Sequence, residues 1–132
     1  MALCEVVQIG IAVVEFEGRY LVGVRGPNGP LPGLHEFPGG KLLPGETPEA
    51  AAVRECLEET GLAVMAESML ATGEHDYPHG RVELFFVRCR PLAPRETALA
   101  GSFEWVPAAT LSSLRFPAAN QAVVAALVHA HA

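Results

Sequence analysis

The chain has 132 residues, of which 50% are hydrophobic and 18% are charged, and its net charge is −6 at neutral pH. This length fits one domain and leaves no room for two cores of ordinary size, so we expect a single domain over residues 1–132. The apolar content excludes a disordered chain. The acidic balance argues against a nucleic acid polymer or an anionic membrane as partner, because both need an excess of lysine and arginine.

Cysteine usage and the N-terminal segment bear on the compartment. Cys4, Cys56 and Cys89 form no close pair and leave an odd cysteine over, which favours reduced thiols in the cytoplasm over a disulfide framework. Residues 1–14 are apolar but lack a basic start, so they predict a strand and not a signal peptide. We therefore expect a cytoplasmic protein, and the sequence leaves monomer and homodimer open.

The first predicted elements form a hairpin. Residues 5–16 are mostly apolar and β-branched, residues 19–25 resume an extended pattern, and a Glu-Gly turn joins the two segments. Glycine and proline crowd residues 26–35, which predicts a loop. A short extended piece over residues 36–41 then breaks into a glycine turn.

The strongest helix signals in the chain belong to residues 48–60. Thr47 suits the N-cap, Pro48 suits the first helical position, and Gly61 supplies the end of the helix. A carboxylate at Glu49 favours the positive end of the helix dipole.

Three further strands and a second helix complete the prediction. The strands are expected at residues 62–72, 81–90 and 103–106, with a turn over 76–80 and a helical turn near 107–111. A last helix starts near Pro117 and carries apolar residues at helical spacing. The order of elements predicts an α+β fold, an α/β/α sandwich in which a mixed sheet lies between two main helices.

The helix over residues 48–60 gathers carboxylates on one side. At about 100° per residue, Glu58 and Glu59 lie within about 60° of Glu55, while Val53 and Leu57 lie nearly opposite and are expected to pack onto the sheet. Like charges at this spacing destabilise a helix. A hard divalent cation would offset that cost, because such cations favour carboxylate oxygens. The alternative is a solvated acidic face.

The segment around this helix resembles a known motif. Gly40, Glu46 and the run Arg54–Leu62 occupy the positions of a complete Nudix box, so the chain resembles the Nudix hydrolase family. The order of strands and helices is similar to that family over nearly the whole chain. The resemblance implies the Nudix sandwich fold and hydrolysis of a phosphoanhydride bond with Mg²⁺, or with Mn²⁺.

The resemblance also assigns roles to box residues. The implied metal ligands are Glu55, Glu58, Glu59 and the backbone carbonyl of Gly40. Arg54 would orient Glu55 or its neighbours, and Glu46 would fix the loop before the helix, so both are included with the catalytic residues. The general base varies in the family and often lies outside the box, and Glu96 and Glu104 are the candidates here.

Two stretches look like the MutT-type branch, whose members remove oxidised guanine nucleotides. They are residues 36–41 and Phe116–Asn120. The resemblance implies substrate binding by Asn120, which would read the base, by Arg25 and by Phe37. The amide of Asn120 offers a donor and an acceptor, as the N7–H and O6 edge of 8-oxoguanine requires. Asn120 as a helix cap and Arg25 as a solvated strand end are the structural alternatives.

Position 99 is among the departures from that branch. The glutamate that MutT-type enzymes use after the box has no counterpart here, because Leu99 stands at the matching place.

The resulting hypothesis is an enzyme that cleaves a nucleoside triphosphate, 8-oxo-dGTP or dGTP, to the monophosphate and pyrophosphate. Its partner is therefore a small nucleotide. A pyrimidine nucleoside triphosphate or another nucleoside diphosphate derivative is the alternative substrate. A nucleotide-binding module without catalysis is the alternative class.

Overall fold

The structure is a computed structural model that describes residues 5–29, 31–78 and 80–132, except for the side chain of Tyr77. Cys4 and His79, which entered the expectations about thiols and about the turn over 76–80, lie outside the described residues. In chain order the elements are β1 (Glu5–Phe16), β2 (Arg19–Val24), β3 (His35–Glu36), β4 (Gly39–Lys41), α1 (Pro48–Thr60), β5 (Val64–Tyr77), β6 (Gly80–Pro91), β7 (Glu104–Pro107), the 3₁₀ helices η1 (Ala108–Ser113) and η2 (Ala118–Asn120), and α2 (Gln121–Ala130).

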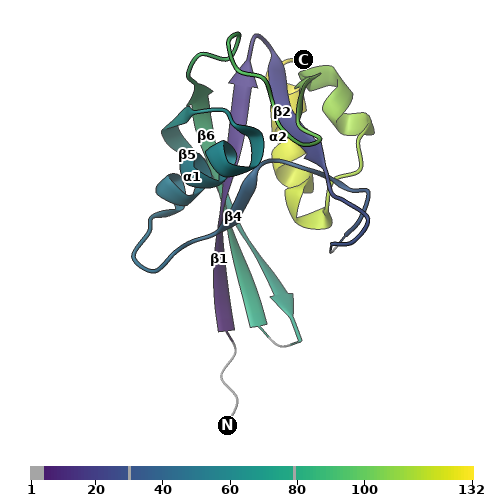
Figure 1. Ribbon diagram of the computed structural model, residues 1–132. Helices are drawn as coiled ribbons and strands as arrows, with labels where there is room; N and C mark the ends of the chain where they lie inside the picture. The colour runs from purple at the N-terminus through teal and green to yellow at the C-terminus, as the bar shows by residue number, and fades with distance from the viewer. Residues whose placement is uncertain (1–4, 30, 79) are drawn as a thin grey trace.

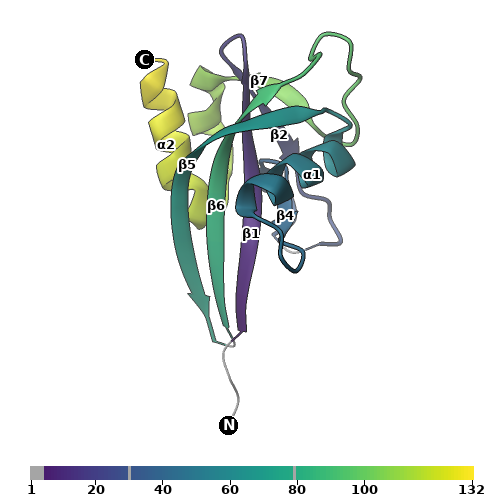
Figure 2. The ribbon, with the colours of Figure 1, turned by 90° about the vertical axis from the view of Figure 1, so that its left-hand side faces the viewer.

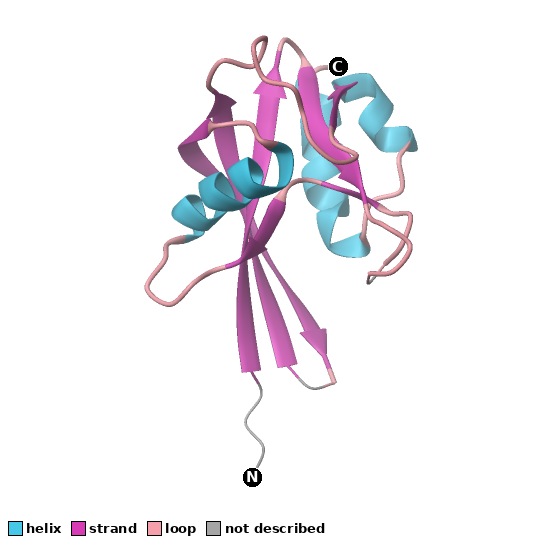
Figure 3. Ribbon diagram, viewed as in Figure 1, coloured by secondary structure: helices cyan, strands magenta, loops and turns pink. Residues whose placement is uncertain are grey.

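The described strands form one mixed sheet in which β1 is central (Figure 3). Its main order is β3-β2-β1-β6-β5, with β4 paired to β1 and β7 paired to β2. The pairing of β1 with β6 is parallel and runs from Glu5 opposite Gly80 to Val14 opposite Cys89. All other pairings are antiparallel, including the predicted hairpin of β1 and β2.

Helix α1 covers one face of the sheet, and α2 with η1 covers the other, as two views at right angles show (Figures 1 and 2). The alternation along β1 explains both contacts, since successive side chains of a strand point to opposite faces. Ile11 and Val13 enter the core beneath α2, and Ala12 and Val14 enter the core beneath α1. The α/β/α sandwich and the α+β class predicted from the sequence are therefore confirmed.

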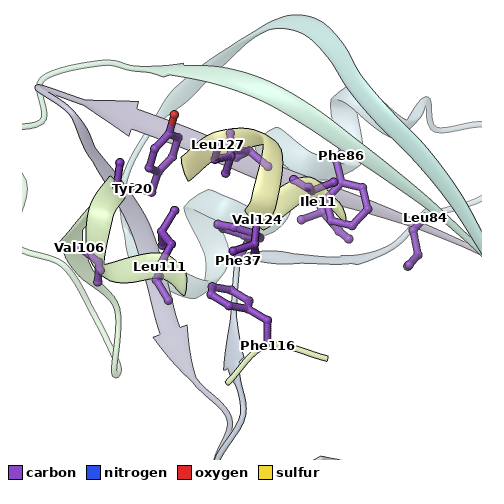
Figure 4. Packing of buried hydrophobic residues seen from close by; sticks show 14 residues of the cluster. Ile11, Tyr20, Phe37, Leu84, Phe86, Val106, Leu111, Phe116, Val124 and Leu127 are labelled. Atoms are coloured by element: carbon purple, nitrogen blue, oxygen red, sulfur yellow. The ribbon is translucent and has the colours of Figure 1, made fainter. Parts of the chain in front are cut away.

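The core beneath α2 contains most of the large side chains. Tyr20, Leu111, Phe86 and Leu127 are each at most 2% exposed and converge there from four elements (Figure 4). Burying side chains of this size contributes about 1.5–3 kcal/mol each. Among the described residues, no helix combines the length and the apolar character needed to cross a membrane.

The face by which α1 packs onto the sheet differs from the prediction. Ala52 and Cys56 are fully buried against it, whereas Leu57 is 51% exposed and Val53 only borders the core. The reason is the close approach of α1 to β1 at Gly10. A Cβ atom there would lie 2.5 Å from the Pro48 carbonyl oxygen, so only small residues of the helix fit against the strand.

Most predicted boundaries agree with the structure within a few residues. The helix over 48–60 is confirmed, with the Thr47 side chain accepting a hydrogen bond from the Ala50 amide at 3.1 Å and with Gly61 at a φ of 79°. Strand β5 extends further than 62–72, because its pairing with β6 continues to Tyr77 opposite Gly80. The last helix begins with the turn η2 after Pro117 and becomes α-helical at Gln121.

Candidate active site

Two glycines bring the backbone of β4 against the acidic side of α1. Gly39 and Gly40 pair with Ile11 and Gly10 of β1, directly beside the helix. A Cβ atom on Gly40 would lie 2.5 Å from the carboxyl carbon of Glu55, so no other residue leaves this carboxylate where it is. The predicted proximity of Gly40 to the helix carboxylates is therefore present in the structure.

Arg54 contacts three members of the carboxylate cluster, which consists of Glu46, Glu55, Glu58 and Glu59. Its Nε donates to Glu46 Oε2 at 2.8 Å, and its Nη2 donates to Glu46 Oε1 at 2.9 Å and to the Lys41 carbonyl oxygen at 3.0 Å. Its Nη1 donates to Glu55 Oε1 at 2.8 Å and lies 3.3 Å from Glu58 Oε2. One guanidinium thus joins the loop before α1 to two carboxylates on the helix.

Glu46 fixes the loop over residues 42–47. Besides the two bonds from Arg54, its Oε1 accepts a hydrogen bond from the Leu43 amide at 2.9 Å. These donors stabilise the ionised form and lower the pKa of Glu46 to about 2, with the hydrogen bonds from Arg54 as the largest cause. Glu46 therefore contacts Arg54 and the loop, which agrees with a supporting role.

Glu59 contacts β4. Its Oε1 accepts a hydrogen bond from the Gly39 amide at 2.9 Å, which ties α1 to β4. Burial raises the pKa of Glu59 to about 7, and the nearby carboxylates of Glu36 and Glu55 raise it further, against the hydrogen bond from Gly39. A carboxylate in this setting carries an incompletely compensated charge.

The cluster has the chemistry of a site for a hard divalent cation. The side chain of Glu55 is 18% exposed and that of Glu58 is 57% exposed, so solvent reaches part of each. Within the described part of the chain, no group of three His, Cys, Asp or Glu side chains is already spaced to hold a metal ion. Instead, Arg54 donates to a carboxylate oxygen of Glu55, and the Gly39 amide donates to one of Glu59. The candidate ligand atoms are carboxylate oxygens and the backbone carbonyl oxygen of Gly40. Hard divalent cations prefer such oxygen ligands, so the residues fit Mg²⁺ or Mn²⁺.

A cavity of about 270 Å³ adjoins this cluster. Gly39, whose amide binds Glu59, forms part of its wall, so the cavity and the carboxylates meet at that residue. The rest of its lining is mainly apolar side chains from β1, β6 and the segment before α2, joined by four polar side chains: Arg25, Glu36, His75 and Asn120.

The three predicted substrate residues all line this cavity. Asn120 is 8% exposed and makes no side-chain capping bond to α2, so the alternative of a helix cap is not what the structure shows. Arg25 lies with its Nε 3.6 Å from Glu36 Oε1 and is not a solvated strand end. Phe37 is 4% exposed and stacks on Phe116 with ring centroids 5.0 Å apart (Figure 4).

The two candidates for a base outside the box do not join the cluster in any contact of the described residues. Glu96 is exposed beside Arg95, which binds Glu17 at 3.0 Å in the turn after β1. Glu104 is exposed on β7 opposite Val22.

Glu36 is the acidic residue that sequence reasoning missed. It lines the cavity, lies close enough to Glu59 to raise the pKa of that carboxyl, and has its own pKa raised by burial against the effect of Arg25. Its place in the predicted extended piece just before Phe37 was the available signal, but pairing with β2 decides where it points.

The arrangement agrees with the comparisons with known proteins. A family profile described as the NUDIX domain matches residues 10–126. The chain belongs to the Nudix family. It is a hydrolase that acts on phosphoanhydride bonds, of the MutT type.

Individual relatives support the same placement. The 8-oxo-dGTP diphosphatase of Escherichia coli K12 is 31% identical over 122 residues, which cover 91% of this chain and 95% of that protein. The CTP pyrophosphohydrolase of the same organism is 31% identical over 72 residues, covering 54% of this chain and 53% of that protein. The solution structure of MutT from methicillin-resistant Staphylococcus aureus 252 has a TM-score of 0.78 and 28% identity, covering 97% of this chain and 99% of that one.

Proposed function

We propose that this Nudix hydrolase cleaves a deoxynucleoside triphosphate to the monophosphate and pyrophosphate, with 8-oxo-dGTP preferred over dGTP. The observation that carries the proposal is the cavity that is lined by Asn120 and by Gly39, whose amide binds the Glu59 carboxylate of α1. A base in the cavity places its phosphates toward those carboxylates. The substrate named for the E. coli relative agrees with this choice.

In this proposal the phosphate end of the site is built from α1 and β4. Glu55, Glu58, Glu59 and the Gly40 carbonyl would hold Mg²⁺ or Mn²⁺. When bound, such an ion neutralises charge on the phosphates and lowers the pKa of water. Arg54 orients Glu55 and Glu58, and Glu46 holds Arg54 in place. A carboxylate of the cluster accepts the proton of the attacking water.

The base end of the site is the cavity. The Asn120 amide donates to O6 and accepts from N7–H, a pair that 8-oxoguanine offers and guanine lacks. Binding unmodified guanine leaves a buried acceptor unpaired, which costs about 1–3 kcal/mol. Phe37 supports the cavity wall through its stack on Phe116.

A pyrimidine nucleotide is the second candidate, because the CTP pyrophosphohydrolase of E. coli is also similar to this chain. Pyrophosphate release from 8-oxo-dGTP, dGTP, dCTP, CTP and a nucleoside diphosphate sugar, each with Mg²⁺ and with Mn²⁺, separates the candidates. A large kcat/KM preference for 8-oxo-dGTP supports the proposal. A preference for pyrimidines or the sugar nucleotide rejects the purine, and no turnover of any leaves a binding module.

The variant Asn120→Ala tests whether Asn120 recognises the base. We expect the ratio of kcat/KM for 8-oxo-dGTP and dGTP to fall about tenfold or more, because the N7–H partner is lost. Gln8→Ala is the control, since this amide is exposed and bonds only to Glu83 at 3.1 Å among its described side-chain partners. An equal loss on both nucleotides would mean that Asn120 is structural.

A further inference from the structure

The cavity is lined by one carboxylate that has no role in the proposed recognition of the base by Asn120. Its polar side chains are Arg25, Glu36, His75 and Asn120, so Glu36 is the single carboxylate among its described lining residues. The Glu36 side chain is 28% exposed and faces Arg25, with Nε and Oε1 3.6 Å apart. A half-buried carboxylate is a strong hydrogen-bond acceptor for any ligand that enters.

The backbone holds this carboxylate in one place. Glu36 pairs with Gly23 of β2, and the next residue, Phe37, is locked by its stack on Phe116 at 5.0 Å. Arg25, the residue that follows β2, flanks the carboxylate with its guanidinium. The position of Glu36 is therefore set by the sheet and the core, and does not depend on a flexible loop.

The hydrogen-bond donors of an 8-oxoguanine base need acceptors in the cavity, and Glu36 can supply two of them. An 8-oxoguanine base carries N1–H, two N2–H and N7–H donors, and each needs an acceptor once it is buried. The amide of Asn120 has one acceptor oxygen, and the guanidinium of Arg25 has none. With Asn120 engaged by N7–H, the imidazole of His75 offers at most one further acceptor nitrogen, so among the described lining side chains Glu36 has the two acceptor oxygens that match N1–H and N2–H together.

We propose that the Glu36 carboxylate accepts hydrogen bonds from N1–H and N2–H of a guanine-type base and thereby selects guanine over adenine and cytosine. Adenine N1 and cytosine N3 are acceptors, so these bases would place a lone pair against the carboxylate. This inference rests on the proposed function, because it takes the cavity as the base site.

Calorimetric titration with three nucleoside monophosphates in EDTA tests the proposal without hydrolysis. The ligands 8-oxo-dGMP, 8-oxo-dIMP and 8-oxo-dAMP share N7–H and differ at the edge that Glu36 would contact. For Glu36→Gln we expect the affinity ratio of 8-oxo-dGMP to 8-oxo-dAMP to fall at least about tenfold. The loss on 8-oxo-dIMP should be smaller than on 8-oxo-dGMP, because 8-oxo-dIMP lacks the N2 amine.

Two further variants separate recognition from structure. Glu36→Asp keeps the acceptor type and should retain the preference for guanine with weaker binding. Glu67→Gln is the matched control, since Glu67 is an exposed carboxylate 4.0 Å from the Arg90 guanidinium and outside the cavity, and it should behave as wild type.

An equal loss on all three ligands in Glu36→Gln, an unchanged ratio, or wild-type protein without preference would each overturn the inference. Wild-type protein that selects guanine monophosphates through Glu36 but releases no pyrophosphate from triphosphates would overturn the proposed hydrolysis alone. The two proposals therefore fail separately.

Discussion

Arg54 holds both carboxylate oxygens of Glu46, through Nε at 2.8 Å and Nη2 at 2.9 Å, although the two residues lie on opposite sides of the start of α1. Such two-point pairs fix orientation as well as distance. The remaining nitrogen of Arg54 is thereby aimed at Glu55 and Glu58. Glu46 acts on the cluster through this contact.

Glu46→Gln should therefore reduce kcat without abolishing folding. A glutamine keeps one bond to Arg54 and loses the charge, so Arg54 is less well held, and support of this kind is worth about 10- to 100-fold in activity or metal affinity. Steady-state pyrophosphate release and the increase of Tm with Mg²⁺ measure both effects. Glu49→Gln, an exposed carboxylate in the first turn of the same helix, is the control. If Glu46→Gln has the kcat of wild type and the same increase of Tm with Mg²⁺, Glu46 does not support the carboxylate cluster.

Gly40→Ala should disable the cluster through a single methyl group. The added Cβ atom would lie 2.7 and 2.8 Å from the two carboxylate oxygens of Glu55, which must move away. We expect a loss of about 10- to 100-fold in metal affinity, measured by calorimetry with Mn²⁺. Gly73→Ala is the matched control, because nothing lies within 4 Å of its Cβ position. Unchanged Mn²⁺ affinity would show that Glu55 is not a ligand.

Glu58→Gln should separate activity from stability. The side chain is 57% exposed and its contact with Arg54 is an i,i+4 pair, which is worth about 0.3–0.5 kcal/mol, so Tm should hardly change. If Glu58 is a metal ligand, kcat/KM should fall by about 100-fold or more. Pyrophosphate release and thermal melting in the same buffer give both numbers. Activity that survives the change would refute the assignment.

The raised pKa of Glu59 predicts a pH dependence of stability in protein freed of metal. The pKa is about 7 in the folded state and 4.5 in the reference state, so only the unfolded state ionises between these values. Stability from this group is complete below pH 4.5 and is lost as the pH rises to 7. Glu59→Gln has no such loss, so its Tm in EDTA should gain on wild type over that range. A constant difference would contradict the shift.

The composition of α1 and its caps could be interpreted without the tertiary structure. Thr47 and Gly61 bound the helix as predicted, because capping depends on neighbouring residues of the chain. The angular spacing of Glu55, Glu58 and Glu59 follows from the helical period alone. Which apolar residues of α1 are buried did not follow, since the close approach of β1 at Gly10 favours Ala52 and Cys56 over Leu57.

The residues that line the base-binding cavity could be predicted less completely from the sequence than those of α1. Asn120, Arg25 and Phe37 were predicted as substrate residues from a resemblance, and the sandwich brings them to one cavity from three segments. Glu36 escaped prediction because its neighbours Arg25 and Glu59 are distant in the chain. Pairing of β3 with β2 brings Glu36 to Arg25.

The sequence by itself determined the Nudix box, the helix that carries its carboxylates, and the order of strands around it. These depend on the identity and spacing of nearby residues, which local backbone geometry converts directly into positions. Only the tertiary structure decided that Glu36 lines the cavity and that the residue next to Glu96, Arg95, pairs with Glu17 in the turn after β1. Such outcomes depend on strand pairing and on how closely a helix approaches a sheet, and both involve contacts between segments far apart in the chain.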